Sequence, residues 1–185
     1  YGEDGLVSGL LRLNYSYADK YIVALNMRAD GSSKFAKGNR WGYFPSFSAA
    51  WRMTQEKFMN NISWLDDLKL RVSYGSLGNQ SVASYAYMAT YTTSLPDGRY
   101  TFGPGTQTLY QGYYAGVMAN PDLKWETTTQ TNVGIDAALL KNKLLLTLDY
   151  YDKRTKDILI NPPALGAYGS IGNQLINGAT VHNKG

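Results

Sequence analysis

Residues 125–153 read WETTTQTNVGIDAALLKNKLLLTLDYYDK, and this stretch decides the fold class. It contains two alternating runs joined by the short segment Lys141-Asn142-Lys143. In the first run, Trp125, Thr127, Thr129, Thr131, Val133, Ile135, Ala137 and Leu139 alternate with Glu126, Thr128, Gln130, Asn132, Gly134 and Asp136. In the second run, Leu144, Leu146, Leu148 and Tyr150 alternate with Thr147, Asp149, Tyr151 and Lys153. Successive side chains of a strand point to opposite faces, so the stretch predicts a β-hairpin with one apolar and one polar face.

The same period of two appears in four earlier segments, over residues 6–17, 20–30, 46–53 and 68–74. Every charged residue within these alternating cores falls on the polar set, and none falls on the apolar set. We therefore expect an all-β chain with about six consecutive antiparallel strands. From Asn161 onward the chain is rich in Gly and Asn, and we expect no further strand there.

The composition excludes several classes of protein. The chain has 185 residues, of which 44% are hydrophobic and only 17% charged, so it suits an ordered domain rather than a disordered tail. No apolar run reaches the roughly 18 residues that a membrane-spanning helix needs. The chain has no cysteine, which excludes disulfides and thiolate ligands. A net charge of +4 is too small and too dispersed to indicate nucleic acid as a partner.

The connections between the predicted strands alternate in length, which is the pattern of a sheet that crosses a membrane repeatedly. Short or medium connections at Ala18-Asp19, 55–67 and 141–143 alternate with much longer ones. A soluble antiparallel sandwich also has one apolar and one polar face, so periodicity leaves both architectures open. Strands of about ten residues, aromatic residues at the ends of the apolar face and a polar face rich in Ser, Thr, Asn and Gly favour the membrane.

A membrane barrel assigns the two faces different surroundings. Aromatic side chains at the ends of the apolar set are expected to face lipid or form an interfacial girdle. These are Tyr15, Tyr17, Tyr21, Trp51, Trp125 and Tyr150. Charged side chains of the polar set are expected to line the lumen, and these are Arg12, Arg28, Arg52, Arg71, Asp136 and Asp149. We expect Arg28, Arg52 and Arg71 to form ion pairs with Asp30, Asp136 and Asp149, or to contact a plug, rather than to bind substrate.

Several longer phrases recur in one order along the chain. They are DKY at 19–21, RADGSSKF at 28–35, GYFPSFSAAWR at 42–52, LKLRVSYG at 68–75, GNQ at 78–80, NPDLKWE at 120–126, NVGID at 132–136, DYYDK at 149–153 and NKG at 183–185. Together these phrases resemble the barrel region of SusC/RagA-type TonB-dependent outer-membrane transporters of Bacteroidota. The resemblance covers nearly the whole chain and is weakest over residues 81–119.

This resemblance implies a transmembrane β-barrel of about 22 strands with a plugged lumen. Residues 1–185 would then be a partial barrel domain, with the plug and the barrel-closing strands outside the chain. The resemblance implies a place in the outer membrane, in contact with its lipid, and active import of large nutrients, either glycan fragments or peptides. It also implies a SusD-like surface lipoprotein that closes as a lid, and TonB, which would contact another part of the parent. No cofactor is implied.

The long connection between residues 75 and 122 is rich in tyrosine, and its flat aromatic rings suit sugar rings, peptide side chains or a lid protein. The candidate contact residues are Tyr85, Tyr87, Tyr91, Tyr100, Tyr110, Tyr113 and Tyr114. Simple packing within the loop is the alternative explanation for these residues.

Signatures of catalysis are not found in the sequence. His182 is the only histidine and lies in a Gly- and Asn-rich tail, so no metal cluster can be built around it, and we expect a loop or surface role rather than that of a ligand or base. We therefore expect no enzyme activity, no catalytic residue and no metal site. The alternative function is a soluble β-sandwich module that binds carbohydrate through surface tyrosines.

Overall fold

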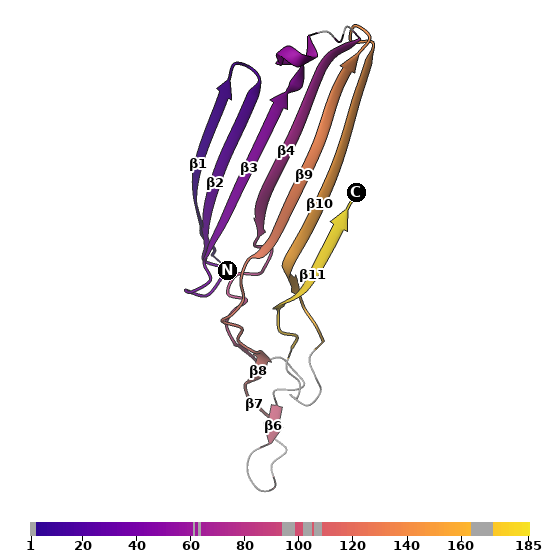
Figure 1. Ribbon diagram of the computed structural model, residues 1–185. Helices are drawn as coiled ribbons and strands as arrows, with labels where there is room; N and C mark the ends of the chain where they lie inside the picture. Colours follow the sequence, from indigo (N-terminus) through magenta and orange to yellow (C-terminus); the bar gives the residue numbers. More distant parts are fainter. Residues whose placement is uncertain are drawn as a thin grey trace.

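Seven strands form one antiparallel sheet in the computed structural model of the protein (Figure 1). The structure describes residues 3–60, 62, 64–93, 99–101, 105, 109–163 and 172–185. The sheet consists of β1 (Leu6–Tyr17), β2 (Tyr21–Ser32), β3 (Trp41–Arg52), β4 (Leu65–Asn79), β9 (Glu126–Leu139), β10 (Leu144–Ile160) and β11 (Ile176–Lys184), in that spatial order. Each strand thus pairs with the main-sheet strand that precedes or follows it along the chain.

The remaining elements lie in the connections. The strands β5 (Thr90–Thr92) and β8 (Tyr114–Val117) pair with each other, as do β6 (Arg99–Thr101) and β7 (Leu109–Gln111). Two single 3₁₀ turns, η1 (Met53–Gln55) and η2 (Lys57–Met59), follow β3. Among the described residues, no helix has the length and hydropathy needed to cross a membrane.

The register of the sheet places the two alternating sets on separate faces. Directly opposed residues share a face, and one such row runs across all seven strands. It consists of Leu13, Leu25, Phe47, Tyr74, Thr131, Asp152 and Lys184. Leu11, Leu25, Val72, Val133 and Leu146 are all exposed on this face, and no second layer of the described chain covers it. A β-sandwich is therefore wrong for the described part of the chain.

The connections sort by length onto opposite ends of the sheet, as predicted (Figure 1). The short-turn end carries residues 18–20, the η1–η2 segment and residues 140–143. The long-loop end carries the β2–β3, β4–β9 and β10–β11 connections. In the first short turn, Ala18 and Asp19 adopt positive φ angles of 52°, and the Lys20 amide donates to the Tyr17 carbonyl oxygen at 3.0 Å.

The last strand, β11, contradicts the expectation that the chain ends without one. It pairs with β10 from Asp152–Lys184 to Ile160–Ile176, with register shifts on both sides of Ile158. The alternation of apolar and polar residues is weak in this strand, because Gly178 and polar residues separate its few apolar side chains. Backbone pairing with a long neighbour holds such a strand although its own alternation is faint.

Pairing between β3 and β4 is shorter than either strand. It joins Ser46–Arg52 to Lys69–Gly75 and stops at Ser46, next to Pro45. Proline has no N–H to donate to a ladder, so the pairing does not continue to Pro45. Beyond this point the ring of Phe44 lies against Gly42 and Gly78, and a side chain at either glycine would collide with it.

A small hydrophobic core occupies the long-loop end of the sheet. It consists of Phe35, Phe44, Val82, Leu123 and Trp125. The Trp125 ring lies 5.2 Å from Phe35 and 5.5 Å from Phe44 between centroids, and its Nε1–H donates to the Arg40 carbonyl oxygen at 3.0 Å. The prediction that Trp125 faces lipid or forms a girdle is therefore wrong. Trp125 precedes β9, so it no longer follows the alternation of the strand, and the loops fold over it.

We predict that Gly78→Ala destabilises the protein by about 1–3 kcal/mol, because the added methyl group displaces the Phe44 ring. Phe44→Ala alone should cost about 3–5 kcal/mol, and the double variant should cost less than the sum of the two changes. Urea-induced unfolding followed by tryptophan fluorescence measures all three. Gly9→Ala is the matched control, because no atom lies within 4 Å of its added methyl group. Strict additivity in the double variant would contradict this packing.

Candidate functional site

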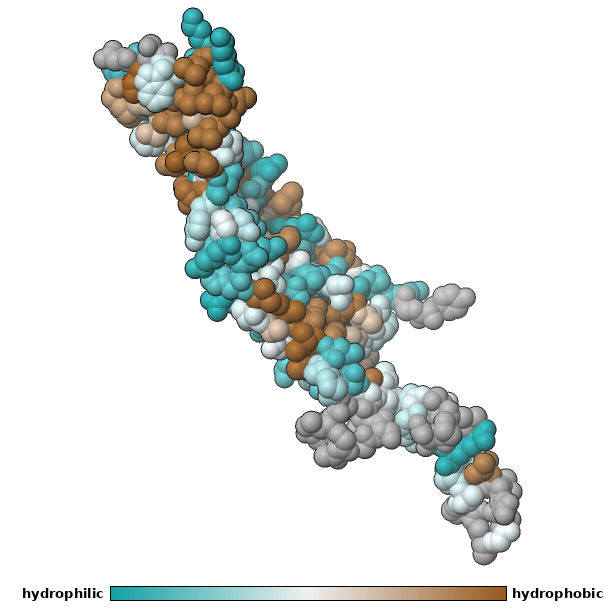
Figure 2. All heavy atoms as spheres, turned by 90° about the vertical axis from the view of Figure 1, so that its right-hand side faces the viewer, coloured by the Kyte–Doolittle hydropathy of each residue, from teal (hydrophilic) through white to brown (hydrophobic). Residues whose placement is uncertain are grey.

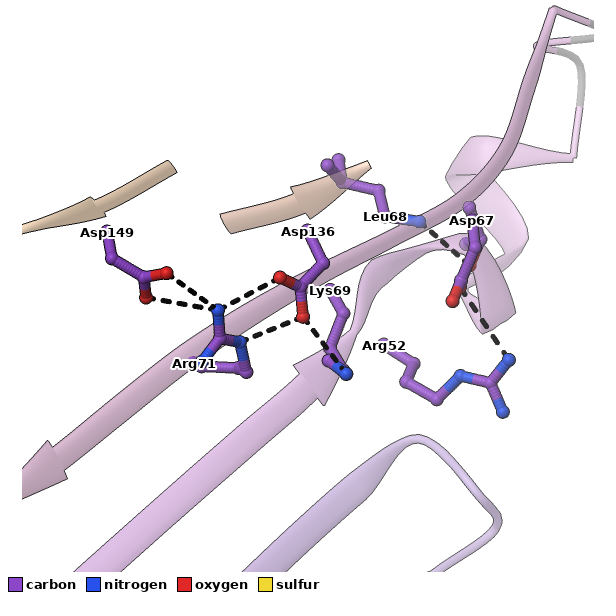
Figure 3. A network of polar contacts seen from close by, with 8 residues as sticks. Arg52, Asp67, Leu68, Lys69, Arg71, Asp136 and Asp149 are labelled. Carbon is purple, nitrogen blue, oxygen red and sulfur yellow. Dashed lines mark hydrogen bonds and ion pairs between the residues drawn. The ribbon is translucent and has the colours of Figure 1, made fainter. Parts of the chain in front are cut away.

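The polar face of the sheet carries a charged cluster that spans β4, β9 and β10 (Figure 3). The Arg71 guanidinium donates from Nε and Nη2 to the two carboxylate oxygens of Asp136, at 2.8 and 2.9 Å. The same Nη2 group donates to Asp149 at 3.0 Å, and Lys69 Nζ lies 3.0 Å from Asp136. The predicted ion pairs of Arg71 with Asp136 and Asp149 are thus present.

Gly134 makes this cluster possible. It lies directly between Arg71 and Asp149 in the register, and its own position has no side chain. A Cβ atom there would collide with the Asp149 carboxylate and crowd the Arg71 guanidinium. The glycine therefore allows an arginine on β4 to reach an aspartate two strands away, so that one ion-pair network ties three strands together.

The other predicted polar-face residues also have partners on this face. Arg12 Nε donates to Asn26 at 2.7 Å, and Arg28 Nε lies 2.7 Å from an Asp30 carboxylate oxygen. Arg52 differs from the prediction, because it pairs with Asp67 at 3.6 Å rather than with the predicted aspartates. Asp67 belongs to β4 but falls within the predicted connection 55–67, so it was not among the predicted partners.

A groove of about 380 Å³ adjoins this face, next to the point where β3 and β4 separate. Its lining is mainly hydroxyl and amide side chains, and these include Ser46, Ser48, Ser73, Thr128, Gln130 and Asn132. Such a surface offers neutral donors and acceptors to water or to an uncharged polar ligand.

Aromatic side chains cluster at the short-turn end of the apolar face. Tyr15, Tyr17, Tyr21 and Tyr150 are exposed there or further along the same face, and the rings of Tyr21 and Trp51 stack with centroids 6.4 Å apart. Together with Tyr17, these two lie on one row of the register. Five of the six aromatic residues predicted for this face therefore lie on it, and Trp125 is the exception.

Glu56, which lies between η1 and η2, joins these aromatic residues to the turn. Its carboxylate accepts from Tyr21 Oη at 2.7 Å, from Lys20 Nζ at 3.3 Å and from Trp51 Nε1 at 3.4 Å. The hydrogen bond from Tyr21 is the main cause that lowers the pKa of Glu56, with Lys20 and Trp51 contributing, while partial desolvation opposes the change. Glu56 was not predicted from the sequence, because its main partner, Tyr21, lies 35 residues away along the chain.

The seven loop tyrosines do not form a single site. Tyr100 and Tyr110 lie opposite each other in β6 and β7, with ring centroids 6.3 Å apart. Tyr91 and Tyr114 belong to the β5–β8 pair, and Tyr87 packs against the core at the long-loop end. Tyr113 is the most exposed of the large hydrophobic side chains, with 80% of its surface accessible, and Tyr85 is exposed with a φ angle of 61°.

A larger cavity of about 700 Å³ lies at the base of these loops. Residues 81–86 and 88–90 form one side, and Val117, Asn161, Asn173 and Leu175 complete the lining. Tyr85 is the only one of the predicted contact tyrosines in this lining. Among the described residues, no group of three or more His, Cys, Asp or Glu side chains could hold a metal ion.

Known proteins resemble this chain over nearly its whole length. The profile of the family described as "TonB dependent receptor-like, beta-barrel" matches residues 4–185. TonB-dependent receptor P3 of Formosa agariphila is 37% identical over 183 residues, which are 99% of this chain and 18% of that protein. TonB-dependent receptor SusC of Bacteroides thetaiotaomicron is 38% identical over 155 residues, which are 83% of this chain and 15% of that protein. The chain therefore spans less than a fifth of the length of these relatives.

Solved structures agree with the sequence relatives. A structure of the RagAB peptide transporter superposes with a TM-score of 0.81 at 29% identity, over 98% of this chain and 19% of that chain. The siderophore receptor PirA from Pseudomonas aeruginosa superposes with a TM-score of 0.59 over 98% of this chain and 30% of that chain. At 16% identity, the second match supports the fold alone. The expected resemblance to SusC/RagA-type receptors is confirmed.

We predict that Gly134→Ala costs about 1–3 kcal/mol, because the methyl group forces Arg71 and Asp149 apart. Asp149→Ala should cost less than about 1 kcal/mol, since both side chains of that pair are more than a third exposed. The double variant should again cost less than the sum, as measured by urea unfolding. Gly75→Ala is a control on the same face, because its methyl group would make an ordinary contact of 3.5 Å with Ser46.

We also predict that Glu56 stabilises the protein in a pH-dependent manner. Its pKa is lower in the folded state, so the stabilisation is complete above the ordinary value of 4.5 and is lost as the pH falls through the folded-state pKa. The difference in urea midpoint between the wild type and Glu56→Gln should therefore shrink on acidification below about pH 4.5. When Tyr21→Phe is present in both proteins, the difference in urea midpoint between Glu56 and Glu56→Gln should be smaller. Glu3→Gln, at an exposed position, should leave the midpoint unchanged. A difference that stays constant down to pH 3 would exclude this role.

Proposed function

This chain belongs to the TonB dependent receptor-like, beta-barrel family, and on that premise we propose that it forms part of the wall of an active importer in the outer membrane. The cargo would be a nutrient too large for open pores, either a glycan fragment or a peptide. Kinship with SusC and structural likeness to the RagAB peptide transporter support this cargo class. Because the chain spans under a fifth of these relatives, the seven strands would belong to a larger wall of about 22 strands around a plug.

The observation that carries the proposal is a single-layer sheet with an uncovered apolar face. Hydrocarbon offers no hydrogen bonds, so a membrane wall must satisfy its backbone groups through its own ladder, as these strands do. On β3, ten residues separate Trp51 from Trp41, which is exposed on the same face. A tilted strand gains about 2.5 Å of depth per residue, so these two rings would lie about 25 Å apart along the membrane normal, the height of the apolar band of an outer-membrane barrel.

The polar face would line the interior of the barrel. Its ion-pair network around Arg71 ties three strands together, and the groove with hydroxyl and amide groups would contact water, the plug or passing cargo. The charged side chains are mostly engaged with one another, so a role in keeping the wall rigid fits them better than cargo binding. This segment would do no covalent chemistry.

The long-loop end would face the cell exterior and meet cargo and partner. A SusD-like lipoprotein that captures cargo and closes over the barrel would contact the loops that carry Tyr85, Tyr91, Tyr100, Tyr110 and Tyr113. These five rings are exposed, as a docking surface requires. Energy would reach the importer through TonB and a part of the receptor outside residues 1–185, so this segment would need no nucleotide site.

We predict that Tyr100→Ala combined with Tyr110→Ala weakens cargo binding about tenfold, because this neighbouring pair of rings loses two flat faces. Phe at both positions keeps the rings and should retain most of the binding. The experiment uses the full-length receptor purified from outer membranes with any lipoprotein that accompanies it, and labelled oligopeptide and oligosaccharide pools as probes. Equal binding by the Ala and Phe variants would exclude this pair from the cargo site. Recovery of the receptor only in soluble fractions would overturn the importer itself.

A further inference from the structure

Basic side chains continue the apolar stripe of β10 on its outward face. Leu144, Leu146, Leu148 and Tyr150 are followed, on the same set of alternate positions, by Asp152, Arg154 and Lys156. The register with β9 is unbroken from Leu144 to Lys156, so all seven side chains share one face. Figure 2, which views the molecule from the β11 side, shows hydrophobic side chains near the short-turn end and hydrophilic ones beyond them.

The neighbouring strand enlarges this group. In the pairing of β10 with β11, Lys184 lies opposite Asp152 and His182 lies opposite Arg154. Lys184 Nζ is 3.3 Å and His182 Nε2 is 2.7 Å from the Asp152 carboxylate. On the other side, Thr131, Thr129 and Thr127 lie opposite Asp152, Arg154 and Lys156. We call Arg154, Lys156, His182 and Lys184 the basic patch.

The basic patch has an excess of positive charge. Its three permanent cations face one carboxylate, Asp152, which Lys184 and His182 already approach. Arg154 and Lys156 are exposed, and no acidic partner lies within ion-pair distance of either among the described residues. Neighbouring Asp157 interrupts the alternation with a φ angle of 57° and pairs with Lys124 instead. Two cations are therefore available to an external anion.

The depth of the patch identifies the kind of anion. Ten residues separate Leu144, at the short turn, from Arg154, which corresponds to about 25 Å of depth in a tilted strand. Arg154 and Lys156 would therefore lie just outside the apolar band on the cell-exterior side, where lipid headgroups lie. On β3 the outward positions at this depth carry Trp41 and Tyr43, so the basic character does not extend to that strand.

We propose that the basic patch binds the phosphate groups of an outer-leaflet lipid, with its acyl chains along the Leu144–Tyr150 stripe. This inference rests on the importer proposed above, because it takes the apolar face as the lipid-facing one. An arginine guanidinium binds phosphate in a bidentate manner, lysine adds a point charge, and the Thr129 and Thr127 hydroxyls lie beside them. The outward face of the wall favours lipid over a lid protein, which would dock on the loops, and continuity with the apolar stripe favours a lipid over free phosphate.

Arg154→Gln with Lys156→Gln tests the site in the full-length receptor, purified in detergent. The probe is bis-phosphorylated lipid A, with monophosphoryl lipid A, phosphatidylethanolamine and inorganic phosphate as comparison arms, and native mass spectrometry measures retention. Each cation near an anionic headgroup contributes about fivefold, so the double variant should bind lipid A about 10- to 30-fold more weakly. Wild-type binding should also weaken as salt increases.

Lys153→Gln is the matched control, because it removes one positive charge at the same depth on the opposite face. It should change lipid A binding less than twofold, and Arg154→Lys with Lys156→Arg should retain most of it. Equal binding by wild type and double variant overturns the site, as does displacement of the lipid by inorganic phosphate. Dissociation of a receptor dimer in the double variant, with lipid retention unchanged, assigns the face to a second copy instead. A double variant that still imports cargo and binds lipid A as the wild type does would refute the lipid site alone. Absence of the receptor from outer membranes would refute the proposed importer.

Discussion

The backbone hydrogen-bond ladder is the interaction on which the rest of this structure depends. The sheet has one layer, so few of its side chains are buried and the small core lies at the loop end only. Each strand is held mainly by the two strands beside it, and a slip of one residue would move every leucine of a strand from one face to the other. Both faces of the sheet therefore depend on the same register, and the register must be correct along the whole sheet.

Glycines help to secure this register. Gly134 admits the Arg71–Asp149 contact across β9, and Gly42 and Gly78 admit the Phe44 ring where the pairing of β3 and β4 ends. At Gly134 and Gly78 the partner side chain comes from another strand and fits at only one alignment of the strands, because a neighbouring residue with a side chain would block it, whereas Gly42 lies on the same strand as Phe44. The absence of a side chain at glycine thus makes room both for the Arg71–Asp149 ion pair and for the Phe44 ring next to the loops.

Alternation in the sequence predicted the strands, their faces and the sorting of connections by length, because side-chain direction along a strand is a local property. It could not predict where a strand stops. Trp125 continues the pattern of β9 by one residue but is buried by loops that arrive from distant parts of the chain. Arg52 pairs with Asp67, which lies in a segment predicted to be a connection, and β11 carries few apolar side chains, so in both cases the decisive contact is non-local. The clustering of tyrosines was visible in the sequence, but their division among separate hairpins was not.

The two ends of the sheet are stabilised in different ways. At the short-turn end, tight turns and the Glu56 contacts with Tyr21 and Trp51 leave little freedom for the chain. At the long-loop end, Phe44 of β3 packs with Phe35, Val82, Leu123 and Trp125, which belong to the connections next to the strands. Because apolar side chains are buried at that boundary, a loop can change conformation without breaking the strand pairs on the other side of the core. A sheet that must keep its register can therefore carry loops of differing conformation, provided that such a core lies between them.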